Sequence, residues 1–346
     1  MNLTGANGLQ VVKHNAPLIP LQGSKMNLRS LAVLGAVITL ALAGVQMTQA
    51  AQPHQTAPTR AIRASSYHFQ LGNLQVIALR DGAIPLDAHA LLKGVTTAEM
   101  DRLLAQASLS NPVETSINAF LIKDGAHRIL IDTGAGDFFG PGGGKLIVSL
   151  KATGVEPGEV DAILLTHLHP DHEGGLVHEG KPVFPHATVF VGKPDVDLFL
   201  AKQNQNGAYG VDKAVFQQAT ITLAPYMATD HLKPFIGQTE VLPGITAIPA
   251  PGHTPGHSIY RVQSKGKTMT FIGDLIHIPA VQFPEPAVTF AYDADQSMAA
   301  KQRGKRFNDF VASHELIAAA HLPFPSVGYI KTQGNAYRFV PLNHHK

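Results

Sequence analysis

The sequence contains no cysteine, which excludes disulfide bonds, a lipid-anchoring cysteine and thiolate ligands for a metal. Charged residues are also scarce, at 15% of the 346 residues, whereas hydrophobic residues make up 45%. A chain of this length and composition can bury a substantial core, and without crosslinks that core must stabilise the fold by itself. The sequence shows no internal repeat. We therefore expect a single folded domain.

Acidic residues are absent from the first fifty positions. A short basic start at 26–29, an apolar run at 31–45 and the small-residue exit at 48–50 form the pattern of a secretory signal peptide. We expect residues 1–50 to be an N-terminal extension and signal peptide (about 26–50), with the true start at Met1 or Met26 left open. A retained membrane anchor is the competing interpretation, but the apolar run is at the short end for a membrane span.

The rest of the chain is nearly neutral, with 24 basic residues against 25 acidic ones after the three basic residues of the first fifty are set aside. This balance disfavours a nucleic-acid partner. Residues 51–66 are rich in Pro, Gln and Thr, which predicts a disordered lead-in. The folded domain is then 67–346. We expect the mature protein in the periplasm or outside the cell, without a stable membrane anchor.

The most informative stretch follows a short apolar run at 162–165. That run is too brief for a helix and predicts a buried strand. Three histidines and an aspartate come directly after it and precede a Gly-Gly pair: His167, His169, Asp171 and His172. This order predicts a loop at the end of a rigid strand, where a metal can be held open to substrate. A surface loop that is histidine-rich by chance is the alternative, in a chain with 18 histidines.

Other apolar, strand-like runs end in the same way. The polar residues that follow such runs are Asp132, His167, His253, Asp274 and His321. Strand ends that deliver ligand-type side chains are what a metal site at the edge of packed sheets requires. Imidazole and carboxylate donors without thiolate favour zinc, although manganese, iron or cobalt would also fit.

The pattern His-x-His-x-Asp-His after an apolar strand resembles the signature of the metallo-β-lactamase superfamily, whose fold serves many hydrolases. The resemblance implies an α/β (α+β) fold in which two sheets lie between outer helices, the αββα sandwich. It also implies two divalent ions bridged by a hydroxide that acts as the nucleophile. The implied ligands are His167, His169 and His253 for one ion, Asp171, His172 and His321 for the other, and Asp274 as a bridge. Asp132 would support the ligands from behind the loop, and Asp171 would also orient the hydroxide.

Several branches of the superfamily fit the sequence poorly. The β-lactamases that use a cysteine ligand are excluded, and β-lactamases in general lack a carboxylate where Asp274 stands. Flavodiiron proteins carry a glutamate where His169 stands. Glyoxalase II shares the ligand set, but no clear basic glutathione-binding cluster lies near the C-terminus.

From about Tyr67 to Pro341 the sequence resembles the methyl parathion hydrolase subgroup, which are secreted di-metal phosphotriesterases. The stretches that carry this likeness include 112–116, 132–135, 139–141, 252–257, 273–276, 280–283, 321–322 and 337–341. The resemblance implies a homodimer and a small neutral ester as substrate, such as methyl parathion or paraoxon. It also implies that Phe139, Phe199 and Phe216 hold an aryl leaving group, although most phenylalanines are simply core residues.

His277, three residues after Asp274, departs from that subgroup, which has an apolar residue there. Acyl-homoserine lactonases of the superfamily carry a tyrosine at this spacing. A histidine could donate a hydrogen bond to a developing oxyanion, or it could be a rim residue without a role. We therefore expect an exported di-metal hydrolase of phosphotriesters, with possible lactone or aryl ester turnover. The alternatives are a lactonase, a β-lactam or thioester hydrolase of this fold, and a metal-binding protein without catalysis.

The apolar patterning also predicts individual elements. We expect a hairpin at 67–79 with its turn at Gly72-Asn73, a turn at 80–82, and a helix at 96–107 that opens with a capping pattern. The further strands are expected at 115–122, 128–131, 187–191, 245–250, 267–272 and 317–320, and the further helices at 144–153, 194–202 and 295–311. An edge hairpin at 329–340 closes the chain.

Overall fold

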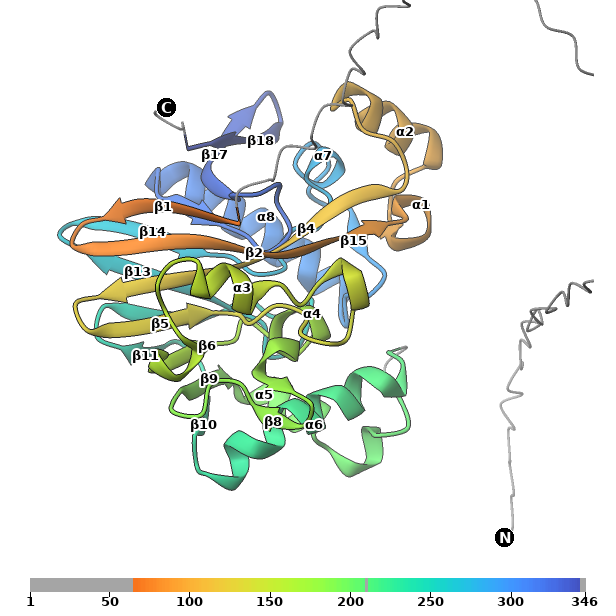
Figure 1. Ribbon diagram of the computed structural model, residues 1–346. Helices are drawn as coiled ribbons and strands as arrows, with labels where there is room; N and C mark the ends of the chain where they lie inside the picture. Colours follow the sequence, from red (N-terminus) through yellow and green to blue (C-terminus); the bar gives the residue numbers. More distant parts are fainter. Residues whose placement is uncertain (1–64, 209–210, 343–346) are drawn as a thin grey trace, which may run out of the picture. The chain divides into compact units, whose positions relative to one another are not determined.

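A computed structural model of the protein describes residues 65–208 and 211–342 (Figure 1). The predicted signal peptide and nearly all of the predicted lead-in lie outside these residues. The first sheet has the order β1 (Ser66–Leu71), β2 (Leu74–Leu86), β4 (Val113–Asp124), β5 (His127–Ile131), β6 (Ala162–Leu164), β9 (Thr188–Gly192), β10 (Leu232–Phe235). The second has the order β11 (Thr239–Leu242), β12 (Ile245–Pro249), β13 (Ser258–Ser264), β14 (Lys267–Phe271), β16 (Leu316–Ala318), β17 (Val327–Gln333), β18 (Ala336–Pro341).

The helices flank these sheets or join their strands. The α-helices of the described residues are α1 (Ala88–Leu91), α2 (Thr97–Gln106), α3 (Leu146–Lys151), α4 (Pro170–Glu173), α5 (Lys193–Phe199), α6 (Lys213–Ala228), α7 (Pro279–Gln282) and α8 (Gln296–Ser313). Short 3-10 turns are η1 (Gly140–Gly142), η2 (Pro157–Glu159), η3 (Gly174–Leu176) and η4 (Lys202–Asn204). Two small strand pairs are β3 (Leu92–Lys93) with β15 (Thr289–Phe290), and β7 (Val177–His178) with β8 (Lys181–Pro182).

Three apolar layers show that the predicted αββα sandwich is correct. Between the two sheets, side chains such as Phe120 of β4 pack against Phe271 of β14, with ring centroids 5.1 Å apart. Outside the first sheet, α3, α5 and α6 bury their apolar faces, for example through Phe216. Outside the second sheet, α8 contributes Phe307 and Phe310. Both faces of the central strands are therefore covered, and β4 is buried without interruption from Thr115 to Ile122.

Most predicted elements are present, and their ends have clear local causes. The hairpin β1–β2 turns at Gly72, whose positive φ of 61° suits glycine and where a Cβ would clash with the carbonyl oxygen of Ser264. Helix α2 begins after Thr96, whose hydroxyl oxygen accepts a hydrogen bond from the Glu99 N–H at 3.2 Å. The edge hairpin β17–β18 is also confirmed. Strand β13 was not predicted, and the apolar pattern gave no signal that separated it from the loop before it.

The predicted turn at 80–82 is wrong. Strand β2 continues to Leu86, and its register against β4 shifts between Arg80 and Gly82, which is a β-bulge. The bulge turns Asp81 inward, where it is fully buried. Its carboxylate accepts hydrogen bonds from three backbone N–H groups, those of Ala135, Gly144 and Leu146, at 2.8–3.0 Å. Asp81 therefore ties together both ends of the loop that contains Phe139.

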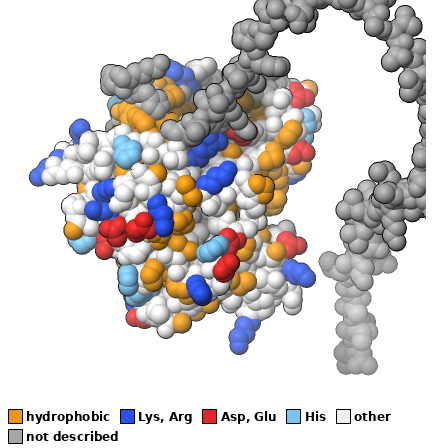
Figure 2. Space-filling model, viewed as in Figure 1, with side chains coloured by type: hydrophobic (Ala, Val, Ile, Leu, Met, Phe, Trp, Pro, Cys, Tyr) orange, Lys and Arg blue, Asp and Glu red, His pale blue; other side chains and the backbone are white. Residues whose placement is uncertain are grey.

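One face of the molecule shows no dominant charge. On the face drawn in Figure 2, basic and acidic side chains are interspersed rather than gathered by sign. Among the helices of the described residues, none has the length and apolar character needed to cross a membrane.

Replacing Asp81 with alanine should lower the free energy of unfolding by about 3 kcal/mol, because three buried N–H groups lose their acceptor. Urea denaturation measures this change. Asp137→Ala is the matched control, since Asp137 lies on the same loop but its exposed side chain pairs only with His178. Equal losses in the two variants would show that the buried hydrogen bonds of Asp81 do not stabilise the loop.

Candidate metal centre

The candidate ligands lie at one edge of the sandwich because of strand direction. Strands β5 and β6 are parallel, and so are β14 and β16, so the carboxyl ends of each pair point the same way. Strand β12 runs in the direction of β14, since each is antiparallel to β13. The residues that follow these five strands within four positions are Asp132, His167, His253, Asp274 and His321. The predicted strand-end pattern therefore corresponds to one continuous site.

Eight side chains at this edge form three overlapping groups of potential metal ligands among the described residues. In each group the donor atoms lie within 4.8 Å of one another. The first group is His167, His169, His253 and Asp274, the second is Asp171, His172 and His321, and the third is Asp274, His277 and His321. The first two groups contain the seven residues that the resemblance implied, with Asp274, the implied bridge, shared by the first group and the third.

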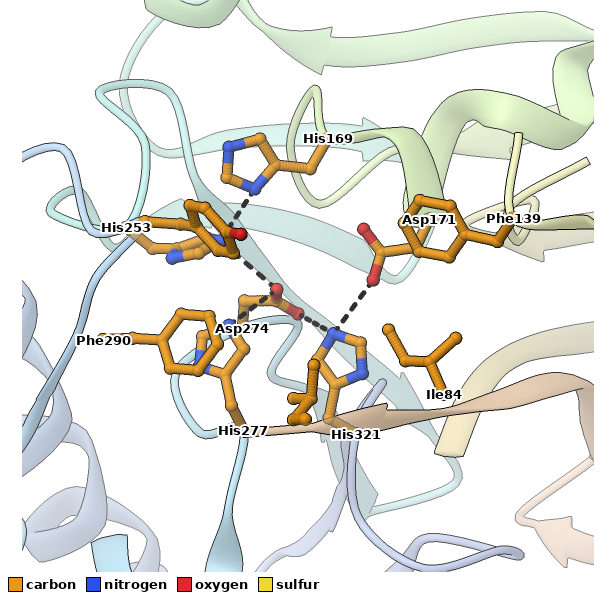
Figure 3. Close-up of a pocket in the computed structure, with 11 residues that line it drawn as sticks. Ile84, Phe139, His169, Asp171, His253, Asp274, His277, Phe290 and His321 are labelled. Carbon is orange, nitrogen blue, oxygen red and sulfur yellow. Dashed lines mark hydrogen bonds and ion pairs between the residues drawn. The ribbon is translucent and has the colours of Figure 1, made fainter. Parts of the chain in front are cut away.

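Asp274 joins the first two groups through its two carboxylate oxygens (Figure 3). Its Oδ2 lies 3.2 Å from His253 Nε2 and 3.6 Å from His167 Nε2. Its Oδ1 lies 3.2 Å from His172 Nε2 and 3.3 Å from His321 Nε2. Both Asp274 Oδ1 and His172 Nε2 are buried without a hydrogen-bond partner. Orphaned donor atoms of this kind fit a pair of divalent ions with Asp274 between them.

Hydrogen bonds on the outer side of three imidazoles determine which ring nitrogen carries the proton. Each Nδ1 lies within hydrogen-bond distance of an oxygen: His172 of Asp132 at 2.9 Å, His253 of Asp293 at 2.8 Å, and His321 of the Ser116 carbonyl at 2.9 Å. Because these oxygens accept, each Nδ1 carries the proton. The Nε2 lone pair of each ring is then directed into the site, as a metal ligand requires.

The charges of the site also favour a bound cation. Burial lowers the pKa of His167 and His169 well below the usual value, so both are neutral and can donate lone pairs. Burial would do the same at His321, but the carboxylates of Asp274 and Asp171 outweigh it and raise the pKa to about 10. The carboxylates of Asp274 and Asp171 thus favour a positive charge at His321 in the second group. A divalent ion can supply it in place of protons.

Two buried aspartates hold the ligand loops in place. Asp132 has a positive φ of 58°, and its carboxylate accepts from the Thr166 N–H at 2.8 Å, directly before the first ligand. Asp195 on α5 accepts from the Leu168 N–H at 3.1 Å and from the Gly256 N–H at 2.6 Å, so it links the loop after β6 to the loop after β12. Asp132 was expected behind the loop, whereas nothing in the local sequence marks Asp195.

Close backbone contacts explain the glycines of the loop. A Cβ at Gly175 would clash with the carbonyl oxygen of Thr133, and the Thr133 N–H donates to the His172 carbonyl at 2.7 Å. The ligand loop therefore lies directly against the segment after β5. His257 has a supporting position: its Nδ1 donates to the Ala250 carbonyl and its Nε2 accepts from the Asp274 N–H, each at 3.0 Å.

A cavity of about 90 Å³ opens above the ligands (Figure 3). The residues that line it are Ile84, Leu86, Phe139, His169, Asp171, His253, Asp274, His277, Phe290, Tyr292 and His321. Apart from the titratable side chains of the floor, the walls are apolar and aromatic, and no lysine or arginine is among the lining residues. His277 lies in this wall, with its ring parallel to that of Phe290 and 4.0 Å from it.

The expectation for two of the three phenylalanines needs correction. Phe139 lines the cavity, but Phe199 and Phe216 are 1% and 0% exposed and do not. They pack against each other in the helix layer, with centroids 5.2 Å apart, because α5 and α6 turn their apolar faces to the first sheet. The one candidate ligand whose ring Phe199 contacts among the ring pairs of the described residues is His169, in an edge-to-face arrangement. Phe290 and Tyr292 form the aromatic wall instead, and no sequence pattern separated them from other loop aromatics.

A family profile described as the metallo-beta-lactamase superfamily matches residues 112–314. The chain belongs to this superfamily. Among solved structures, the chain is similar to AbOPH, described as a hydrolase in the beta lactamase superfamily, with 35% identity, a TM-score of 0.76, and 82% of this chain and 99% of that one covered. It is also similar to AidC, a dizinc quorum-quenching lactonase solved with a homoserine product, with 27% identity, a TM-score of 0.74 and the same coverage.

Curated relatives in the superfamily match over shorter stretches. An N-acyl homoserine lactonase from Bacillus cereus is 22% identical over 171 residues, which cover 46% of this chain and 56% of that protein. A ribonuclease from Thermus thermophilus is 28% identical over 183 residues, which cover 51% of this chain and 38% of that protein. The chain thus spans little more than half of one relative and less than half of the other.

Glu173, the residue after His172, faces away from the cavity toward α6 and is fully buried. The Thr222 hydroxyl on α6 is the polar group beside its carboxylate, but that hydroxyl also lies within hydrogen-bond distance of backbone carbonyls of its own helix, so the carboxylate is poorly satisfied. Burial raises the pKa of Glu173 to about 8. An ionised form at this position would therefore destabilise the fold.

This gives a pH dependence with a defined sign. Since the pKa of Glu173 is higher in the folded than in the unfolded chain, its contribution to stability falls as pH rises between about 4.5 and 8. The variant Glu173→Gln lacks the titrating carboxyl group. The free energy of unfolding of this variant, relative to that of the natural protein, should therefore improve by about 3 kcal/mol between pH 5 and pH 8. Urea denaturation of metal-free protein at both pH values tests this, with the exposed Glu179→Gln as control. A difference that does not change with pH contradicts the prediction.

Proposed function

We propose that the protein is a di-metal hydrolase of small, uncharged esters, with phosphotriesters, lactones and aryl esters as candidate substrates. The observation that carries this proposal is the position of Asp274 between two ligand groups, on the floor of a cavity with apolar walls. The absence of lysine and arginine from the lining residues favours neutral substrates over phosphomonoesters or nucleic acids. Zinc is the first candidate for both ions, because the donors are imidazoles and carboxylates.

The residues of the site have separate tasks in this proposal. Two bound divalent ions would activate a water molecule and polarise the ester oxygen. Asp171, whose side chain is 14% exposed, is the carboxylate of the second group that reaches the cavity, where it can orient the attacking water and hold its proton. Phe139 and Phe290 cover the floor from two sides and pack against the apolar part of the ester.

Lactones gain support from the comparisons. AidC, described as a lactonase, is similar over nearly its whole length, and the Bacillus cereus relative is also a lactonase. Phosphotriesters rest on the resemblance in the sequence alone. On the sequence signals we further propose export to the periplasm or the medium, and on the resemblance a homodimer.

The first prediction from this proposal concerns metal content. The mature protein should hold close to two metal ions per chain, and chelation should abolish hydrolysis of methyl paraoxon and of an acyl-homoserine lactone. His253→Ala should lose about one ion and at least about 100-fold in kcat/KM, because it removes one ligand of the first group. Metal analysis and initial rates measure both effects.

The matched control is His178→Ala, because His178 is exposed and pairs only with Asp137. This variant should keep both ions and full activity. The proposal would be wrong if the natural protein held no metal, or if chelation left hydrolysis unchanged.

A second prediction ranks the substrates through His277. Its ring lines the cavity, and its Nε2–H donates to Asp274 Oδ2 at 3.0 Å. Once Asp274 ligates metal ions, this N–H would be available to donate to the carbonyl oxygen of a lactone. His277→Leu should lower kcat/KM for a lactone by about tenfold or more, which is about 1.4 kcal/mol of transition-state stabilisation, and should affect a phosphotriester less. An equal effect on both substrates would refute the role of His277 in lactone or ester hydrolysis.

A further inference from the structure

Asp293 connects a candidate metal ligand to the wall of the cavity through its two carboxylate oxygens. Its Oδ1 accepts from His253 Nδ1 at 2.8 Å, and its Oδ2 accepts from the Phe290 N–H at 2.8 Å. The side chain is fully buried. Any shift of Phe290 therefore reaches the imidazole of His253 through a single carboxylate.

Backbone hydrogen bonds strengthen this connection. The Ala294 N–H donates to the His253 carbonyl at 3.0 Å, and the Asp295 N–H donates to the Gly252 carbonyl at 2.9 Å. The Asp293 N–H donates back to the Phe290 carbonyl at 2.9 Å. The segment 290–295 and the loop after β12 thus form one unit.

A second route runs from the same aromatic wall to the same ligand group. The ring of Phe290 stacks on His277, and His277 Nε2 donates to Asp274 Oδ2 at 3.0 Å. Asp274 in turn lies 3.2 Å from His253 Nε2. The contacts therefore close a ring that passes through the cavity wall and the first ligand group.

The far end of the same loop is held independently. Arg303, which is buried, donates to the carbonyls of Pro286 and Val288 at 3.0 and 2.6 Å. Strand β15 also pairs with β3. Removal of the Asp293 carboxylate should consequently loosen the wall near His253 without unfolding the loop.

We propose that Asp293 is a positioning residue that couples occupancy of the aromatic wall to retention of the metal held by the first group. An apolar ligand that packs on Phe290 restricts the motion of the cavity wall. Through Asp293 it also restricts His253 to the orientation in which it can bind a metal. The conformational entropy lost on ordering Phe290 and His253 is therefore lost once, for ligand and metal together. Linkage requires the reverse effect as well: a bound metal must strengthen binding of that ligand by the same factor. This inference rests on the two-metal site proposed above.

The test is chelator competition on the metal-loaded protein, with and without nitrobenzene as an uncharged aryl probe that is not hydrolysed. In the natural protein, nitrobenzene should strengthen the affinity for one of the two ions by about fivefold. In Asp293→Asn, which keeps the size of the side chain but has a single acceptor oxygen, the affinity for one ion should fall by about tenfold. The nitrobenzene effect should disappear in this variant, while the second ion is bound as before.

Asp295→Asn is the matched control. Asp295 lies on the same segment, but its carboxylate caps α8 by accepting from the Met298 N–H, a task that asparagine also performs. Asp295→Asn should therefore keep both the metal affinities and the nitrobenzene effect. Circular dichroism and thermal melts of both variants establish that they are folded.

The outcomes separate this inference from the proposed function. If the natural protein binds two ions but Asp293→Asn retains the same affinities and the same nitrobenzene effect, the coupling is wrong and the two-metal hydrolase stands. If Asp293→Asn weakens both ions equally and keeps the nitrobenzene effect, Asp293 has only a general structural role, and the coupling is again wrong. A natural protein that binds no metal would overturn both.

Discussion

The contact on which the rest of this structure depends is the Asp274 carboxylate between two clusters of imidazoles. Its two oxygens lie 3.2–3.6 Å from four Nε2 atoms, two in each ligand group. Such an arrangement requires the ends of β6, β12, β14 and β16 to lie at one edge of the sandwich. The order and direction of the strands in both sheets place them there. A buried carboxylate is stable only if positive charge is supplied beside it, which explains why the site suits divalent ions.

Around this centre, buried carboxylates hold the candidate ligands in their orientations through hydrogen bonds. Asp132 and Asp293 each accept a hydrogen bond from the outward nitrogen of one imidazole, and Asp195 joins the two loops that carry the histidines of the first group. Each of these aspartates is buried, and each has both a backbone N–H and a further partner. Rigid orientation of the ligands thus comes from groups that never touch an ion, as is common for metal sites.

The ligands were predictable from the sequence because each one follows a short apolar strand, so local patterning is enough to place His167, His253 and Asp274. The supporting residues were not, because their partners lie far away in the chain: Asp81 meets Ala135 54 positions on, and Asp195 meets Gly256 61 positions on. The bulge at Asp81 is also invisible in a pattern that marks Asp-Gly as a turn. Phe199 was misplaced for the same reason, since only the packing of α5 on the first sheet decides that its ring faces the core.

Substrate choice belongs to a different part of the molecule from metal binding. The walls come from β2, from the loop that Asp81 ties down, and from the segment that Asp293 joins to His253, whereas the floor comes from the strand ends. A change in Ile84, Phe139 or Tyr292 can alter the shape of the cavity while every candidate ligand stays in place. This separation allows one fold to serve different substrates. It also explains why the ligand motif alone identifies the superfamily and leaves the substrate to be decided by the walls.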